Sequence, residues 1–325
     1  MKKTYNVGVM GCANIAIRSI IPSFILSDRF NLYGIASRSI EKADSVANEY
    51  KCKSFGSYDE LLDDSLIDLV YIPLPTGLHY EWIYKALLKK KHVMSEKSLA
   101  CSYNEVKKLT ELAKKNDLLL IENFQFRFHS QNKWVKDFLG KKELGEIRCF
   151  RSSFGFPPFK DDNIRYDKEL GGGALLDAGA YTVKSMLYLF SECKFKLRSA
   201  TLWTTFNKEV DIYGGAYFDS DLGIIAELAF GFDNYYQCNY EIWGSKGKLT
   251  VNRAFTAPPT MSPTIIIEKQ DFREEIKFSP DNHFVNMINH IAKCLDLHCF
   301  EEEYSQNLQQ AYYLEQIKQY SYENK

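Results

Sequence analysis

Two side chains in the middle of the chain have types and a spacing suited to proton chemistry. Asp177 and Tyr181 follow the glycine triplet Gly171–Gly173 in the run GGGALLDAGAY, whose later part has a helical pattern. Residues four apart share one face of a helix, so the carboxylate and the phenol would stand side by side. Such a pair can hold a carbonyl oxygen and exchange a proton with it, and the glycines suggest a close backbone approach to a ligand. The alternative is a core tyrosine with its hydroxyl capped by a neighbour.

A lysine in the first third of the chain is the next candidate. Lys97 stands in the segment KKHVMSEKSLA, directly after an expected strand at His92–Ser95. Open α/β sheets bind ligands at the carboxyl ends of their strands, which is where this ammonium would lie. On its own, the position suits an exposed loop lysine equally well.

The first turn of the chain has the composition of a phosphate-binding loop. An expected strand, Tyr5–Met10, runs into a GxAxxA form of the dinucleotide fingerprint. Gly11 permits the tight turn, Ala13 lets the backbone approach a pyrophosphate, and Ala16 lets the helix lie close to the sheet. The expected cofactor-binding residues of this turn are Gly11, Cys12, Ala13, Asn14 and Ile15. An ordinary tight turn between a strand and a helix is the alternative.

The end of the second expected strand indicates which dinucleotide would bind. NAD-binding proteins carry an acid there for the ribose hydroxyls, but this chain reads Ala36-Ser37-Arg38-Ser39 and has no carboxylate before Glu41. The Arg38 guanidinium and the Ser37 hydroxyl suit a 2′-phosphate instead. We therefore expect NADP(H), the alternative being a solvated arginine at a helix start.

The elements that must position these residues fall into two domains. Strands and helices alternate over residues 1–123, which predicts a doubly wound parallel sheet of the Rossmann type. Over residues 124–325 consecutive strands without intervening helices predict an α+β domain with a large, mostly antiparallel, open-faced sheet. We expect this second domain to bind substrate and to mediate oligomerisation, and its final helix to pack back on the first domain.

Composition and charge exclude several classes of protein. The 325 residues carry 41 basic and 42 acidic side chains without a dominant basic cluster, which argues against nucleic acid or a membrane surface as partner. No apolar run approaches the length of a membrane helix. The eight cysteines form no CxxC pair and the histidines have no metal-ligand spacing, so we expect no metal and a reduced, cytoplasmic setting.

Several segments resemble one known family in matching order. They are the fingerprint, IPLPTGLHYEWIYKAL, KKHVMSEKSLA, ENFQFRF, LGEIRCF and ELGGGALLDAGAY. They resemble the glucose–fructose oxidoreductase/inositol dehydrogenase (Gfo/Idh/MocA) family. Within that family, GCANIA, DNIRY, Tyr181 where many members have histidine, and NRAFTAPP are most similar to nucleotide-sugar 3-ketoreductases of deoxysugar biosynthesis.

The resemblance implies roles for individual residues. Lys97 would lie beside the nicotinamide and anchor the substrate oxygen, Asp177 would bind substrate, and Tyr181 would be the proton donor. Where the family usually has a proline after the lysine, this chain has Ser98, which leaves the geometry of the lysine loop open. Further cofactor-side residues, by the same resemblance, are Pro73, Leu74, Thr76, His79, Glu96 and Asn123. Arg165 would reach the sugar or the diphosphate of the substrate, an ordinary loop residue being the alternative.

The reaction that follows from these assignments is the reduction of a ketone. We expect NADPH to deliver a hydride to the keto group of a nucleotide-linked deoxysugar while Lys97 and Tyr181 stabilise the alkoxide. A dihydrodiol or simple-sugar dehydrogenase on the same fold is the alternative enzyme, and a non-catalytic NADP-binding regulator is the alternative of another class. The aromatic strands at 212–230 and 235–251 predict a homodimer or homotetramer joined through the open sheet face.

Overall fold

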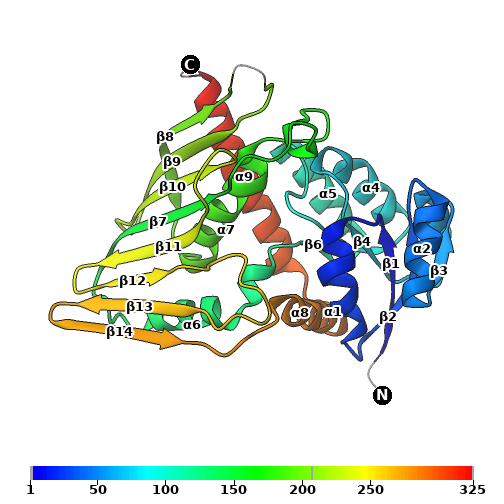
Figure 1. Ribbon diagram of the computed structural model, residues 1–325, viewed down its shortest axis with the longest axis horizontal. Coiled ribbons are helices and arrows are strands. Elements are labelled where there is room, and N and C mark those ends of the chain that lie inside the picture. The colour runs from blue at the N-terminus through cyan, green and yellow to red at the C-terminus, as the bar shows by residue number, and fades with distance from the viewer. Residues whose placement is uncertain (1–2, 206–207, 324–325) are drawn as a thin grey trace. The chain divides into compact units, whose positions relative to one another are not determined.

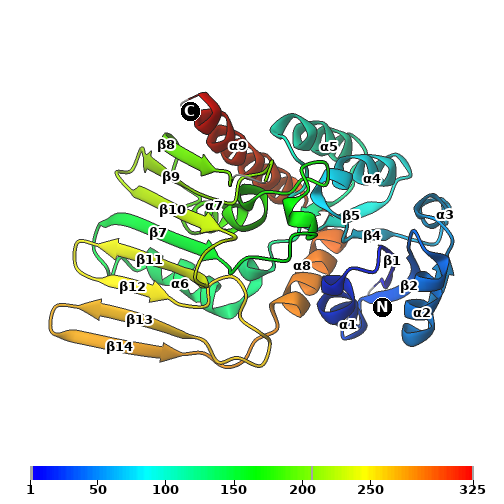
Figure 2. The same ribbon diagram turned by 45° about the horizontal axis from the view of Figure 1, so that its top comes forward.

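The computed structural model describes residues 3–205 and 208–323 and divides into two compact units. The first unit comprises Met1–Asn123 and Phe284–Ala311, and the second comprises Phe124–His283 and Tyr312–Lys325. Figure 1 and Figure 2 show both from two directions. That the two units are independently folding domains stays a prediction.

The first unit contains a six-stranded parallel sheet in the order β3-β2-β1-β4-β5-β6. The order reverses between β1 and β4, as in doubly wound folds, and this confirms the predicted Rossmann sheet. The strands are β1 (Tyr5–Met10), β2 (Phe30–Ala36), β3 (Lys53–Phe55), β4 (Leu69–Ile72), β5 (His92–Ser95) and β6 (Leu120–Glu122). The helices of this part are α1 (Ile21–Ile25), α2 (Ile40–Tyr50), α3 (Tyr58–Asp63), α4 (Thr76–Leu88), α5 (Tyr103–Lys115) and α8 (His283–Leu297).

Local sequence explains where these elements begin. All four residues of β4 are buried, as expected for a central parallel strand covered on both faces. Serines accept the backbone N–H three residues later at the starts of α2, α3 and α5, which satisfies one of the free N–H groups of each helix. These capping residues are Ser39, Ser57 and Ser102.

The second unit contains an eight-stranded sheet in the order β14-β13-β12-β11-β7-β10-β9-β8. All neighbours pair antiparallel except β7 and β10, which are parallel. Hairpin turns at Ser220-Asp221 and at Ser245–Gly247 join β9 to β10 and β11 to β12. The strands are β7 (Ile147–Gly155), β8 (Phe195–Trp203), β9 (Tyr213–Ser220), β10 (Ile225–Gly231), β11 (Gln237–Gly244), β12 (Lys248–Val251), β13 (Thr264–Lys269) and β14 (Phe272–Lys277).

One face of this sheet holds the core of the unit. Alternate residues are buried in the strands from β7 to β13, including Phe150 and Phe154 of β7 and Phe230 of β10, whereas the edge strand β14 has no buried residue. Helix α7 (Ala180–Leu189) packs against β7 and β10 on this face (Figure 1). Two further helices belong to the chain, α6 (Ser130–Gly140) and α9 (Glu301–Glu323).

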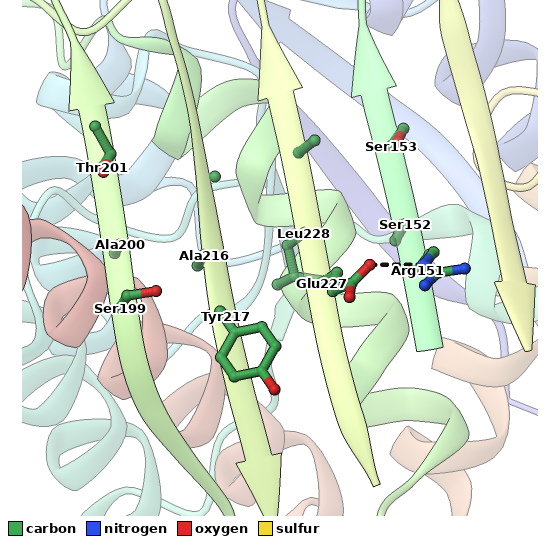
Figure 3. Close-up of a pocket in the computed structure, with 12 residues that line it drawn as sticks. Arg151, Ser152, Ser153, Ser199, Ala200, Thr201, Ala216, Tyr217, Glu227 and Leu228 are labelled. Atoms are coloured by element: carbon green, nitrogen blue, oxygen red, sulfur yellow. Dashed lines mark hydrogen bonds and ion pairs between the residues drawn. The ribbon is translucent and has the colours of Figure 1, made fainter. Parts of the chain in front are cut away.

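The opposite face of the sheet carries small, charged and aromatic side chains (Figure 3). Arg151 of β7 pairs with Glu227 of β10 at 2.6 Å, next to an open depression of about 430 Å³. The depression is lined by Ser152, Ser153, Ser199, Ala200, Thr201, Gly215, Ala216, Tyr217, Leu228 and Ala229 together with that ion pair. At one end of these strands Trp203 stacks on Tyr213, and both side chains are exposed. Assembly through this face stays a prediction.

Candidate functional site

The turn after β1 has the geometry of a phosphate cradle. Gly11 has φ +122°, a value that favours glycine, and its N–H donates to the Ala36 carbonyl at the end of β2 (2.8 Å). A Cβ at Gly11 would lie 3.1 Å from a methyl of Leu74, so a side chain would crowd the turn. The first helical hydrogen bond follows at once, from the Ile17 N–H to the Ala13 carbonyl. Because the first N–H groups of a helix lack intrahelical partners, a dinucleotide pyrophosphate fits here.

The end of β2 carries an exposed arginine. Arg38 is exposed, and no carboxylate pairs with it among residues 3–205 and 208–323. The nearest acid in sequence, Glu41, accepts a hydrogen bond from the Ser39 hydroxyl at 2.7 Å, which lowers the pKa of its carboxyl. Ser37 is buried, and its hydroxyl accepts from the Ser39 N–H at 3.4 Å. The guanidinium therefore keeps its hydrogen-bonding capacity for an anion from outside the chain.

His79 connects two of the expected cofactor-side segments. Its imidazole is fully buried, with Nε2 2.7 Å from the Leu74 carbonyl and Nδ1 2.7 Å from the Ser98 carbonyl. Burial lowers the pKa of His79 to about 4, although both carbonyl contacts favour the charged form. The ring therefore positions the Lys97-Ser98 loop, in agreement with a structural histidine rather than a catalytic base. Thr76 opens α4, after Pro75.

The loop that carries Lys97 is tied at several points. The Lys97–Ser98 peptide bond is cis, and the Leu99 N–H donates to Oε1 of Glu122 at 2.9 Å. Before the lysine, the Glu96 carboxylate accepts from the Tyr71 hydroxyl at 2.7 Å and from the Asn123 side-chain amide at 2.5 Å.

Burial raises the pKa of Glu96. The sequence picked out Glu96 and Asn123 as cofactor-side residues, and the structure places them as mutual partners that hold the lysine loop. Glu122 was missed. Its position at the end of a buried strand next to Asn123 was the signal that could have found it.

In the second unit, Asp177 and Arg165 form an ion pair with Nε and Oδ2 2.5 Å apart. Arg165 also lies over the Phe159 ring, with 4.7 Å between its Cζ and the ring centroid. The structure thus brings together two residues that the sequence had named separately for substrate binding. Asp177 lies in a π-helical turn (Leu175–Gly179) that leads into α7.

The glycine triplet before that turn lets neighbouring segments of the chain approach its backbone closely. A Cβ at Gly172 would lie 2.4 Å from the Arg165 carbonyl oxygen, and one at Gly173 would lie 2.4 Å from Oδ1 of Asp211. The Asp211 carboxylate caps the start of the helix by accepting from the Leu175 N–H at 2.6 Å. The close approach that we expected toward a ligand is therefore made by neighbouring segments of the loop. These contacts fix the position of Arg165.

Tyr181 lies at the start of α7 in a cluster of aromatic rings. Its ring centroid is 4.9 Å from that of Phe154, 5.3 Å from Phe124, 5.7 Å from Phe255 and 6.0 Å from Phe126. Only 8% of the residue is exposed. Four rings hold the phenol in one orientation, which a positioned proton donor requires and which a core tyrosine would share.

Two searches of the described residues complete the description. No helix in residues 3–205 or 208–323 is long and apolar enough to cross a membrane. Within the same residues, no three side chains from His, Cys, Asp and Glu gather closely enough to hold a metal ion.

Comparison with known proteins places the chain among oxidoreductases. Residues 5–124 match the oxidoreductase family model with an NAD-binding Rossmann fold, and residues 133–250 match the GFO/IDH/MocA C-terminal domain. A dTDP-3,4-didehydro-2,6-dideoxy-alpha-D-glucose 3-reductase from Saccharopolyspora spinosa is 36% identical over 90% of this chain and 88% of that protein. A D-xylose 1-dehydrogenase (NADP(+)) from Haloferax volcanii is 31% identical over 89% of this chain and 88% of its own length.

A solved structure is similar over nearly the whole chain. It is a 3-ketoreductase from Actinomadura kijaniata in complex with NADP and TDP-benzene, 34% identical, with a TM-score of 0.94 and coverage of 98% of both chains. The family that the sequence motifs indicated is thereby confirmed. This chain belongs to the Gfo/Idh/MocA family of NAD(P)-dependent oxidoreductases.

Proposed function

We propose that the chain is an NADP(H)-dependent ketoreductase whose substrate is a nucleotide-linked keto-deoxysugar. The observation that carries the proposal is its similarity, over about nine tenths of its length, to reductases that act on a dTDP-linked keto-deoxysugar. When bound, NADPH supplies a hydride for the keto carbon. The exposed Arg38 guanidinium, for which the described residues provide no carboxylate partner, would hold its 2′-phosphate.

Lys97 and Tyr181 would act on the keto oxygen of the substrate. The Lys97 ammonium would stabilise the negative charge that develops on this oxygen, and the Tyr181 hydroxyl would donate the proton. An ammonium near a phenol also favours the phenolate, which helps the proton to leave. The ties of the lysine loop to His79 and Glu122, and the aromatic rings around Tyr181, support this role because they hold both groups in place.

The Asp177–Arg165 pair would take part in substrate binding. A carboxylate that is already paired with a guanidinium accepts sugar hydroxyls while its own charge stays balanced. We therefore assign hydroxyl recognition to Asp177 and orientation of Asp177 to Arg165.

We also propose that the working form is a homodimer or homotetramer joined through the open face of the eight-stranded sheet. Exposed aromatic side chains on that face, Trp203, Tyr213, Tyr217 and Trp243, support a protein partner. The ladder of alternating charges, Glu227–Arg151–Glu241–Lys248–Glu268, suits a self-complementary contact.

The test is NADPH oxidation with a panel of carbonyl substrates. A dTDP-linked 3-keto-deoxysugar should be reduced with a kcat/KM at least 100-fold above that for the corresponding free sugar. Oxidation of D-xylose or of a dihydrodiol with NADP⁺ at the higher kcat/KM would replace the proposal with a simple-sugar or dihydrodiol dehydrogenase. NADPH binding without turnover of any member would support a regulator.

A further inference from the structure

We infer that Arg253 binds the diphosphate of the nucleotide-linked substrate. The inference rests on the proposed function and adds to it the residue that selects for a phosphorylated sugar. It starts from the Arg253 guanidinium, which no carboxylate of the described chain neutralises, on a segment whose Phe255 packs against the proposed proton donor Tyr181.

Pairing of the strands places Arg253 at the end of β7. β12 runs antiparallel to β11, which runs antiparallel to β7, so β7 and β12 end at the same edge of the sheet. Just beyond β12, the Ala254 N–H donates to the Cys238 carbonyl at 2.9 Å, and Cys238 is the register partner of Phe154. Phe154 contacts the Tyr181 ring.

The segment around Arg253 is fixed on both sides. The Phe255 ring packs against Phe154 (5.1 Å between centroids) and against Tyr181 (5.7 Å). From α6, the Gln131 side chain donates to the Arg253 carbonyl at 2.7 Å, and the Asn132 side chain donates to the Ala254 carbonyl at 2.9 Å. These contacts fix the backbone of Arg253 to α6 and to the aromatic rings around Tyr181.

The guanidinium is oriented by a phenol. Its Nη1 donates to the Tyr236 hydroxyl, and its Cζ lies 5.0 Å from the centroid of the Tyr236 ring. The Tyr236 hydroxyl is in turn 2.9 Å from Oγ1 of Thr256. These contacts use one of the five N–H donors of the guanidinium and neutralise none of its charge.

Most other arginines on this unit have an acid. Arg165 pairs with Asp177, Arg151 with Glu227 and Arg198 with Asp219. Arg253 is only partly exposed, and in residues 3–205 and 208–323 no carboxylate lies within ion-pair distance of it. A half-buried cation without an acid is the arrangement expected of an anion-binding residue, since charge-assisted hydrogen bonds to a ligand offset its desolvation.

The anion that suits this position is a phosphate on the sugar. If Tyr181 protonates the keto oxygen, a cation on the segment packed against Tyr181 lies within reach of groups on the far side of the sugar ring. In a nucleotide sugar, the anomeric carbon carries the diphosphate there. Guanidinium binds phosphate oxygens through parallel N–H donors, whereas a neutral sugar such as xylose gives it no counter-charge.

Direct binding of dTDP by calorimetry tests the assignment without any turnover. The Arg253→Ala change should weaken dTDP binding by about 10- to 100-fold, the range for a charged hydrogen bond in a partly buried site. Thymidine, which lacks phosphate, should bind both proteins equally. Arg148→Ala is the matched control, because Arg148 is an exposed arginine at the opposite end of β7, and its dTDP affinity should stay within two-fold of the parent.

Two further variants protect the test against a misfolded protein. Tyr236→Phe keeps the charge of Arg253 and removes only the hydroxyl that orients it, so a loss of about two- to five-fold in dTDP affinity is expected. Arg253→Lys should restore part of the affinity lost in Arg253→Ala, because it returns the charge without the planar donors. With a keto-sugar nucleotide as substrate, Arg253→Ala should raise KM far more than it lowers kcat.

The outcomes separate this inference from the proposed function. Unchanged dTDP affinity in a folded Arg253→Ala protein overturns the inference, even if the parent reduces keto-sugar nucleotides. Binding of dTDP that depends on Arg253, in a protein that reduces no keto sugar, supports the inference and refutes the proposed reaction. A parent protein that reduces a free keto sugar and does not bind dTDP overturns the inference and leaves an NADPH-dependent reductase.

Discussion

Replacing Arg38 with alanine should remove most of the preference for NADPH over NADH. The guanidinium would meet a 2′-phosphate that carries close to two negative charges at neutral pH. A hydrogen bond to a charged group contributes about 1.5–3 kcal/mol, and because Arg38 is exposed we expect the lower end of this range. A loss of about 1.5 kcal/mol weakens NADPH binding about ten-fold. NADH has no 2′-phosphate, so its affinity should change less than two-fold.

The assay is a fluorescence titration of both cofactors at two ionic strengths. Salt screens an exposed pair, so the NADPH preference of the parent should be smaller at 0.5 M than at 0.05 M salt. Lys108→Ala, an exposed charge change on α5, is the control and should affect neither cofactor. Equal affinity of the parent for NADPH and NADH would refute the reasoning, as would an equal loss for both in Arg38→Ala.

Three other predictions concern catalysis, pH and assembly. Tyr181→Phe should lower turnover by about 10²–10⁴ at nearly unchanged NADPH affinity, and near-parental turnover in a folded protein would remove Tyr181 from the mechanism. Adding Lys97→Ala should cost less than the sum of the single losses, because both groups act on one oxygen. Burial lowers the pKa of His79 and His92 to about 4, so both are neutral in the folded protein, whereas the unfolded chain takes up protons below about 6.5. The contribution of both histidines to the free energy of unfolding should therefore be complete above pH 6.5 and fall toward pH 4, and the urea concentration at the unfolding midpoint should fall with it. A midpoint that stays constant between pH 6.5 and pH 4 would contradict this prediction. Ala229→Glu, which puts a charge into the depression on the open sheet face, should shift the sedimentation mass of the parent oligomer to that of a monomer, and an unchanged mass would place the interface elsewhere.

Much of the first unit could be predicted because its signals are local. Gly11 marks the turn after β1, the apolar run at Leu69–Ile72 marks a central strand, and alternation of strands with helices implies their parallel order. Two short elements, β3 and α3, were not predicted. Each is too short to show a period in the sequence.

The second unit was harder to predict because its key contacts join distant residues. Local turn residues such as Ser220-Asp221 and Ser245–Gly247 indicate that β9 pairs with β10 and β11 with β12, but nothing local indicates that β7 pairs in parallel with β10. The same is true of the site. A residue pattern can put Asp177 on a helix, yet only the folded loop brings Arg165 to it. Arg253 lies in the stretch NRAFTAPP, which carried part of the family resemblance, but the sequence assigned it no role because what sets it apart is the lack of an acid nearby in space.

The central position of β7 affects how the second unit can be synthesised and folded. β7 is the first strand of its sheet to be synthesised, but both strands that flank it, β10 and β11, begin only at Ile225 and Gln237. Until the ribosome has delivered those residues, the hydrogen-bonding edges of β7 and apolar side chains such as Phe150 and Phe154 have no partners from the sheet. Sheets that depend on distant pairings fold slowly and expose strand edges that promote aggregation. We therefore expect the emerging chain to be most prone to aggregation between the synthesis of β7 and the synthesis of β11.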